Sequence, residues 1–174
     1  IELMDAGIRK ILLEKPAGLT TSEIHSVCEH AKKTDTRIFV GYNRRFYASV
    51  LEAKKLIEDD GGVLSFNFEF TEWCDDITDK LKHSTTGKNW FLANSSHIAD
   101  TAFYLGGEPK ELHTCIAGGN GWHPTATVFA GAGTTHSGAL FSYQANWDAP
   151  GRWGVEVLTC KHRYIFRPLE KLQI

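Results

Sequence analysis

The sequence predicts an α/β segment followed by a sheet-rich α+β domain. Near the start, two short apolar runs flank an amphipathic helical segment, which is typical of a βαβ unit with parallel strands. From residue 64 onward, apolar and polar residues alternate within several runs, which predicts half-buried strands of an antiparallel or mixed sheet. We therefore expect two domains, residues 1–46 and residues 47–174, the second with a large, open, mostly antiparallel sheet.

The composition is that of an ordinary globular protein. The 174 residues suffice for one domain or for two incomplete ones. Hydrophobic residues make up 42% and charged residues 23%, and the formal net charge of −2 is dispersed. A chain without a basic stripe is a poor fit to nucleic acid or an anionic membrane, and no run approaches the roughly 18 apolar residues of a membrane span. We expect a small-molecule ligand instead.

The four cysteines lie far apart in the sequence and have no C-x-x-C spacing. This pattern does not indicate a disulfide framework or a zinc site, so no metal is expected. Reduced cysteines are usual in the cytoplasm, which is the expected location. The residues are Cys28, Cys74, Cys115 and Cys160.

The first domain is predicted to contain two buried strands joined by a helix. Residues 1–8 resemble the tail of a helix that breaks near Gly7, and residues 11–13 form a wholly apolar run that predicts a strand buried on both faces. Thr20 and Glu23 have capping-box spacing and open the helix. The apolar stripe of this helix consists of Ile24, Val27, Cys28 and Ala31.

A second buried strand is expected within residues 37–42, where Ile38-Phe39-Val40 ends at Gly41. Strand, helix and strand at this spacing predict a right-handed crossover. The segment is too short for a complete doubly wound domain, which needs two mononucleotide-binding halves.

The second domain begins with a predicted helix at residues 49–58. Phe66, Phe68 and Phe70 alternate with polar residues in the strand predicted over residues 64–70, and they are expected in the core or an interface. A helix is predicted at residues 97–105, where Gly106-Gly107 ends it. Further strands are predicted at residues 112–117, 125–130, 139–147, 154–159 and 163–166.

Two polar loops follow the strands of the first domain. Glu14-Lys15-Pro16 follows the first strand, and Gly41-Tyr42-Asn43-Arg44-Arg45-Phe46 follows the second. In open parallel sheets, ligands bind outside the carboxyl ends of the strands. A lysine after a strand is commonly a solvated loop residue, but two polar loops at neighbouring strand ends favour a binding site.

These two motifs at this separation, followed by the segment around His97, resemble the Gfo/Idh/MocA oxidoreductases, which include glucose–fructose oxidoreductase and inositol dehydrogenase. The resemblance runs from about Ile11 through Gly107 and more loosely through the later strands. It implies a Rossmann domain that binds NAD or NADP, followed by an α/β domain that holds a sugar or polyol. Residues 1–46 would then be the C-terminal portion of the Rossmann-type parallel sheet.

The resemblance also implies roles for individual residues. The lysine that matches Lys15 lies beside the nicotinamide and the reacting hydroxyl, where a cation stabilises developing alkoxide charge. Glu14, Pro16, Asn43 and Arg44 are expected to contact the cofactor together with Lys15.

The third motif, Asn94-Ser95-Ser96-His97, is expected to open the helix of the second domain. Relatives often carry Asp-x-Gly-x-His here, with the histidine as proton acceptor or donor, and His97 matches that histidine. Ala93 replaces the aspartate, and Asn94 can replace part of it by hydrogen bonding but cannot carry charge. The alternative is that His97 only caps the helix and packs there.

Several other side chains are candidates for the substrate site. Lys88 and Trp90 precede the His97 segment and are expected to line the cleft together with Lys15, Asn94 and His97. Four further residues either stack on a sugar ring or pack in the core: Trp122, His123, Trp147 and Trp153.

The sequence contains no G-x-G-x-x-G that opens a βαβ unit. The glycine-rich segments at residues 118–121 and 131–133 lie among predicted antiparallel strands, where they indicate turns. The chain opens on Ile1 without Met, so we expect that the phosphate-binding half of the cofactor domain precedes it and that this chain alone is inactive.

The function predicted from the sequence is hydride transfer between NAD or NADP and a secondary hydroxyl of a sugar, cyclitol or nucleotide sugar. A homo-oligomer through the open sheet is also expected. Two alternatives remain open: a non-catalytic sugar-binding or regulatory protein, and a dimerisation domain whose open sheet has an apolar outer face.

Overall fold

A computed structural model describes residues 1–119 and 122–174, which form two compact units, Ile1–Tyr42 and Asn43–Ile174. The division falls after Tyr42, whereas the sequence placed a boundary after Phe46. The short 3-10 helix η1 (Asn43–Phe46) is part of the second unit, because Arg45 forms a bidentate ion pair with Asp100 of that unit.

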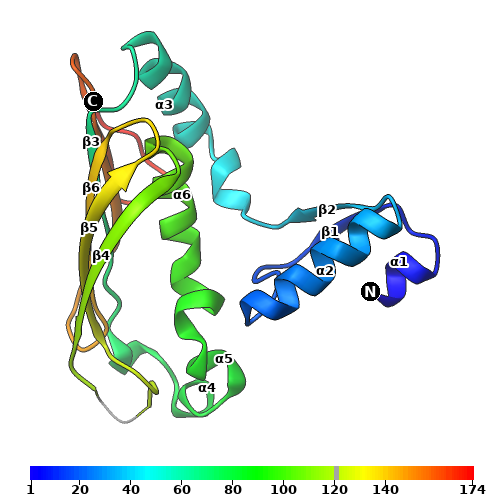
Figure 1. Ribbon diagram of the computed structural model, residues 1–174. Coiled ribbons are helices and arrows are strands. Elements are labelled where there is room, and N and C mark those ends of the chain that lie inside the picture. Colours follow the sequence, from blue (N-terminus) through cyan, green and yellow to red (C-terminus); the bar gives the residue numbers. More distant parts are fainter. Residues whose placement is uncertain (120–121) are drawn as a thin grey trace. The chain divides into compact units, whose positions relative to one another are not determined.

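The first unit is a βαβ arrangement, as predicted (Figure 1). Its elements are α1 (Glu2–Asp5), β1 (Lys10–Leu13), α2 (Thr21–Lys33) and β2 (Arg37–Val40). The strands are parallel and pair Leu13 with Val40. The predicted capping box is confirmed: the Thr20 hydroxyl accepts from the Glu23 backbone N–H, and the Glu23 carboxylate accepts from that of Thr20.

The prediction that both strands are buried on both faces is wrong for the described residues. Leu12 is 79% exposed, and its register partner Phe39 is 58% exposed. The neighbours on the other face are half-buried because α2 covers that face only. A strand needs a layer on each side to bury every residue, and here one layer is present.

The second unit is built on a six-stranded mixed sheet with the order β4-β5-β6-β3-β7-β8. The pair β3–β6 is parallel, and every other pair is antiparallel. The predicted fold class, a mostly antiparallel open sheet with helices, is confirmed. The strands are β3 (Ser65–Phe70), β4 (Pro109–Ala117), β5 (Val128–Thr135), β6 (Leu140–Asn146), β7 (Trp153–Leu158) and β8 (Arg163–Phe166).

Two long helices, α3 (Ala48–Asp59) and α6 (Ser96–Gly106), cover the same face of this sheet (Figure 1). The three phenylalanines predicted from the alternation, Phe66, Phe68 and Phe70, are at most 4% exposed and belong to the core. Ile98 and Ala102 of α6 are fully buried in the same core. None of the helices in the described ranges is long and apolar enough to cross a membrane.

In the centre of the sheet, along β3 and β6, the outer face is mostly polar, whereas the dimerisation alternative assumed an apolar face. Asn67 lies opposite Ser142, and both are exposed. Glu69 and Gln144 form the next pair on that face. Alternation along β3 and β6 sends the aromatic side chains inward and leaves the outer face polar.

Between β3 and α6 the chain forms short elements that periodicity did not predict. They are η2 (Cys74–Asp76), α4 (Asp79–Lys82), α5 (Thr85–Lys88) and the π-helix η3 (Phe91–Ser95).

The strand predicted at residues 125–130 also differs, because β5 continues through the glycines at 131 and 133. A Cβ at Gly131 would lie 2.4 Å from the Tyr143 ring, and one at Gly133 would lie 2.7 Å from the Phe141 ring. These glycines do not form a turn; the lack of a Cβ lets the two aromatic rings pack directly against the backbone of β5.

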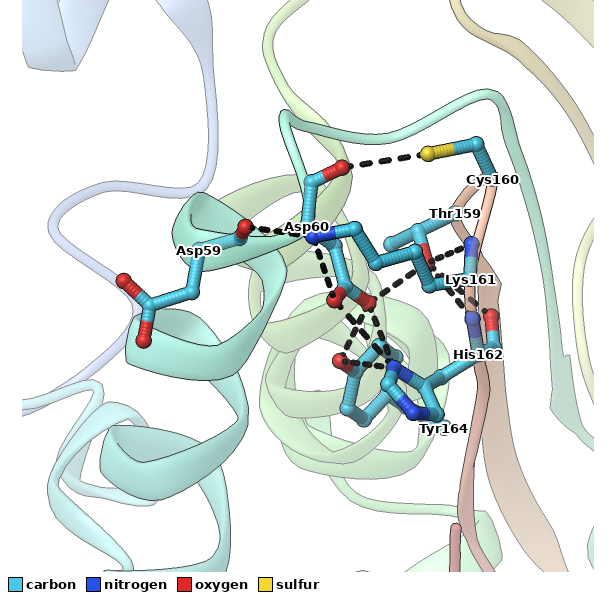
Figure 2. A network of polar contacts seen from close by, with 7 residues as sticks. All are labelled: Asp59, Asp60, Thr159, Cys160, Lys161, His162 and Tyr164. Carbon is cyan, nitrogen blue, oxygen red and sulfur yellow. Dashed lines mark hydrogen bonds and ion pairs between the residues drawn. The ribbon is translucent and has the colours of Figure 1, made fainter.

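A polar network fixes the end of α3 to the β7–β8 hairpin (Figure 2). The Asp60 carboxylate accepts hydrogen bonds from the Tyr164 hydroxyl at 2.6 Å and the Thr159 hydroxyl at 2.7 Å. His162 Nδ1 lies 2.9 Å from the same carboxylate oxygen. Because Asp60 is only 7% exposed, its carboxylate depends on these partners in place of water.

Candidate functional site

In the first unit, the two predicted motifs meet at the carboxyl ends of the strands. The Gly41 backbone N–H donates to the Leu13 carbonyl at 2.8 Å, so both strands end at one edge. A Cβ on Gly41 would lie 3.7 Å from the Glu14 carboxylate, which brings the Glu14-Lys15-Pro16 loop beside Gly41-Tyr42. Lys15 and Pro16 are half-buried, and Glu14 is exposed. This edge is where open parallel sheets bind ligands.

In the second unit, a cleft of about 480 Å³ opens beyond the end of β3. Arg44 and Asn94, two residues predicted for binding, line it. Trp153, predicted as a ring-stacking candidate, lines it as well. The lining residues are Arg44, Thr71, Glu72, Trp73, Asp76, Asn94, Gly151, Arg152, Trp153, Pro168, Leu169 and Glu170.

Arg44 is positioned by an aromatic ring and a carboxylate. Its guanidinium lies 4.7 Å from the centre of the Trp153 ring and 3.9 Å from the Glu170 carboxylate. Next to it in the sequence, Arg45 holds η1 against α6 through Asp100. The two arginines therefore differ in role, because Arg45 anchors the segment and Arg44 presents a cation to the cleft.

The cleft contains a carboxylate that the sequence analysis missed. Glu72 follows the end of β3 and accepts a hydrogen bond from Asn94 Nδ2. Burial raises the pKa of Glu72 because it disfavours the charged form, while the contacts with Trp90 and Asn94 act in the opposite direction. A signal was present in the sequence: Thr71-Glu72-Trp73 is a polar and aromatic segment directly after a strong strand pattern.

His97 lies in a continuous helix rather than at a free helix start. The π-helix η3 leads directly into α6, and the His97 carbonyl accepts from the Thr101 hydroxyl at 2.8 Å within α6. His97 is therefore not the cap of α6, whereas the packing part of that alternative agrees with its position in the helix. His97 is half-buried and is not among the residues that line the cleft. It belongs to the second unit and Lys15 to the first, so their catalytic pairing stays a prediction.

The remaining candidates divide between surface and core. Lys88 is exposed at the end of α5, and Asn43 begins η1; neither lines the cleft. Trp90 is 7% exposed and packs in the core beside Trp122, with ring centres 6.3 Å apart. Trp147 is fully buried, which excludes stacking on a sugar ring.

His123 packs edge-on against the ring of Trp147, with ring centres 4.9 Å apart, and burial lowers the pKa of His123.

The glycine-rich segment 118–121 lies partly outside the described residues. Within the described ranges, all four cysteines are free, and no group of three His, Cys, Asp or Glu side chains is placed to hold a metal.

Sequence comparison relates the chain to one characterised enzyme. It is 27% identical over 103 residues to myo-inositol 2-dehydrogenase of Thermotoga maritima, which covers 59% of this chain and 30% of the relative. The chain matches no family model. It thus spans about a third of the length of the curated relative.

Comparison with solved structures relates the fold of the chain to that of two dehydrogenases. Levoglucosan dehydrogenase in complex with NADH and L-sorbose matches with a TM-score of 0.82 at 22% identity, over 98% of this chain and 51% of that one. The WlbA dehydrogenase of Chromobacterium violaceum, in complex with NADH and UDP-GlcNAcA, matches with a TM-score of 0.81 at 18% identity, over 99% and 53%. The chain spans about half of each structure, and these similarities confirm the predicted fold.

Proposed function

We propose that this chain belongs to an oxidoreductase that transfers a hydride between NAD or NADP and a secondary hydroxyl of a sugar, cyclitol or nucleotide sugar. One observation carries the proposal: nearly the whole chain has the fold of sugar and nucleotide-sugar dehydrogenases that bind NADH. The sequence similarity to an inositol dehydrogenase supports the same class of substrate.

The residues of the first unit fit the nicotinamide end of such a cofactor. Lys15 and Gly41 lie at the carboxyl edge of parallel strands, where ligands of open α/β sheets bind. The sequence has no glycine-rich turn for the pyrophosphate, so these residues would contact only the reacting end. A bound oxidised nicotinamide would supply the hydride acceptor for oxidation of the carbinol carbon.

The protein then has to manage the hydroxyl proton and the charge on its oxygen. The ammonium of Lys15 stabilises the negative charge that develops on the oxygen as the proton leaves. His97 accepts that proton at an imidazole nitrogen and returns it in the reverse direction. The cleft in the second unit offers Arg44, Asn94 and Trp153 for hydrogen bonds to a sugar and for stacking on its ring.

The test is steady-state turnover by the whole protein with NAD and NADP, using myo-inositol, levoglucosan and a nucleotide sugar as substrates. We expect Lys15→Ala to lower kcat by orders of magnitude. Lys10→Ala is the matched control, because Lys10 is exposed at the opposite end of β1. A loss of less than about tenfold, equivalent to about 1.4 kcal/mol in the barrier, would remove Lys15 from the chemical step.

A non-catalytic sugar-binding or regulatory protein is the second candidate, and Ala93 in place of the usual aspartate favours it. Retained sugar binding without any hydride transfer would decide for it. We further propose a cytoplasmic homo-oligomer that pairs through the open sheet and binds neither nucleic acid nor membrane, in keeping with the dispersed charge of −2.

A further inference from the structure

Glu72 and Asn94 form a joined pair in the cleft of the second unit. They come from different elements, since Glu72 follows β3 and Asn94 lies in the π-helix η3. Asn94 Nδ2 donates to Glu72 Oε2, and both residues line the cleft of about 480 Å³. The hydrogen bond fixes two polar groups side by side at the surface of a space large enough for a small molecule.

The chemistry of the pair makes it rich in acceptors. An ionised carboxylate only accepts hydrogen bonds, so the Asn94 amide turns its nitrogen toward Glu72 and keeps its oxygen as an acceptor. Each carboxylate oxygen has two lone pairs, so Glu72 can accept a further hydrogen bond beside its contacts with Asn94 and Trp90. Two neighbouring acceptors match a ligand that offers two neighbouring donors.

The charges around the pair narrow the choice of ligand. Two guanidinium groups, those of Arg44 and Arg152, and three carboxylates line the same cleft, so their charges nearly balance and favour a neutral ligand over a strongly charged one. The exposed ring of Trp73 and the ring of Trp153 offer apolar surface for the C–H face of a ring. A neutral ring with adjacent hydroxyl groups satisfies all of these features.

We infer that Glu72 is a substrate-binding residue of this cleft, which with Asn94 accepts hydrogen bonds from two adjacent hydroxyls of a polyol. The inference rests on the proposed function for the class of substrate. It adds a carboxylate that the resemblance did not supply.

The test is titration calorimetry of the whole protein without a nicotinamide cofactor, with myo-inositol and levoglucosan as probes. We expect Glu72→Ala to weaken binding by about ten- to a hundredfold, as for loss of hydrogen bonds to a charged group, and Glu72→Gln to weaken it less. Glu156→Gln is the matched control, because Glu156 lies in β7 on the outer face, opposite Asn67. It should bind within about twofold of the wild type.

A monodeoxy analogue of the tighter-binding probe provides the second arm. Removal of the hydroxyl that donates to Glu72 should weaken binding to the wild type. It should leave binding to Glu72→Ala nearly unchanged, because the analogue and the variant each remove the same hydrogen bond. Circular dichroism checks that each variant folds, and Glu72→Gln replaces Glu72→Ala if the latter does not.

Wild-type affinity in Glu72→Ala, equal losses for the analogue in both proteins, or no saturable binding of either polyol to the wild type would each overturn the inference. Because the measurement needs no hydride transfer, its outcome is separate from that of the proposed function. Binding that depends on Glu72 in a protein without turnover would uphold the inference and reject the oxidoreductase.

Discussion

Asp60 stays ionised although its side chain is almost closed off from water. The hydrogen bond from Tyr164, followed by those from Thr159 and His162, lowers the pKa of Asp60 to about 2, against the effect of burial. The same arrangement, burial first and the Asp60 contact next, raises the pKa of Tyr164 to about 12. Between these two pKa values, Asp60 is therefore ionised and Tyr164 is neutral, so the phenol donates its hydrogen bond to the carboxylate.

We predict that Asp60→Asn lowers stability at neutral pH and that the difference from the wild type disappears in acid. A carboxyl whose pKa is lower in the folded state than in the unfolded state stabilises the fold above the unfolded value, 3.8, and stops doing so as the pH falls through about 2. Urea unfolding of both proteins between neutral pH and pH 2 would measure this.

Asp59→Asn is the control for this experiment, because only the backbone carbonyl of Asp59 takes part in the network, as acceptor from Lys161. Its unfolding midpoint should follow that of the wild type across the titration. A constant difference between Asp60→Asn and the wild type at every pH would contradict the assignment of the effect to ionisation.

At the scale of single elements, the contact between α6 and β3 depends on a glycine. Gly106 is buried at the end of α6, and a Cβ there would lie 2.3 Å from the ring of Phe66. The helix can approach the strand closely only because that atom is missing. The Phe66 ring cannot yield easily, since it also stacks on Phe141 at 5.4 Å.

We predict that Gly106→Ala destabilises the protein by about 1–3 kcal/mol, the usual cost of overpacking a core. Helix propensity alone would favour alanine by about 1 kcal/mol, so the sign of the change separates the two effects. Gly119→Ala is the matched control, because a Cβ at Gly119 meets nothing within 4 Å. Urea unfolding at neutral pH is the measurement, and a stabilised Gly106→Ala would contradict the close packing.

Elements with a strong local signal were predicted correctly from the sequence. The Thr20–Glu23 capping box and the Phe66, Phe68, Phe70 alternation needed only neighbouring residues to be read. The π-helix η3 and the extension of β5 through Gly131 depend on distant side chains, such as the Tyr143 ring, which have no local signature.

The site follows the same division. Arg44 and Asn94, which line the cleft, were singled out because they belong to recognisable motifs, and Lys15 was singled out on the same ground, with a role that stays a prediction. Glu72 was missed because its significance comes from Asn94, which approaches it from a different element 22 positions away. Leu12 was predicted to be buried but is exposed. An apolar run indicates that a strand has two faces suited to burial, but it does not show which elements cover those faces.

At the scale of the whole molecule, we predict that these 174 residues expressed alone bind free NAD and NADP weakly or not at all. The described part of the first unit provides two strands and two helices, and the loop after β1 is Glu14-Lys15-Pro16 rather than a glycine-rich turn. Most of the recognition of such cofactors comes from contacts to the pyrophosphate and ribose, which should be missing here.

Titration calorimetry of the chain with both dinucleotides would check this, with the circular dichroism spectrum as a control for folding. Loss of the pyrophosphate contacts should cost several kcal/mol, and each 1.4 kcal/mol is about tenfold in affinity. Micromolar binding would mean that the cofactor site has been assigned to the wrong residues.

The position of β3 in the sheet affects how the chain folds while it is being synthesised. β3 is the first strand of the second unit along the chain, yet its neighbours are β6 and β7, which pair Phe66 with Phe141 and with Val157. At ribosomal speeds of about 5–20 residues per second, the later partner emerges roughly 5–20 s after β3. During that interval Phe66, Phe68 and Phe70 have no sheet to join, so the nascent chain displays a row of aromatic side chains suited to chaperone binding and exposed to aggregation.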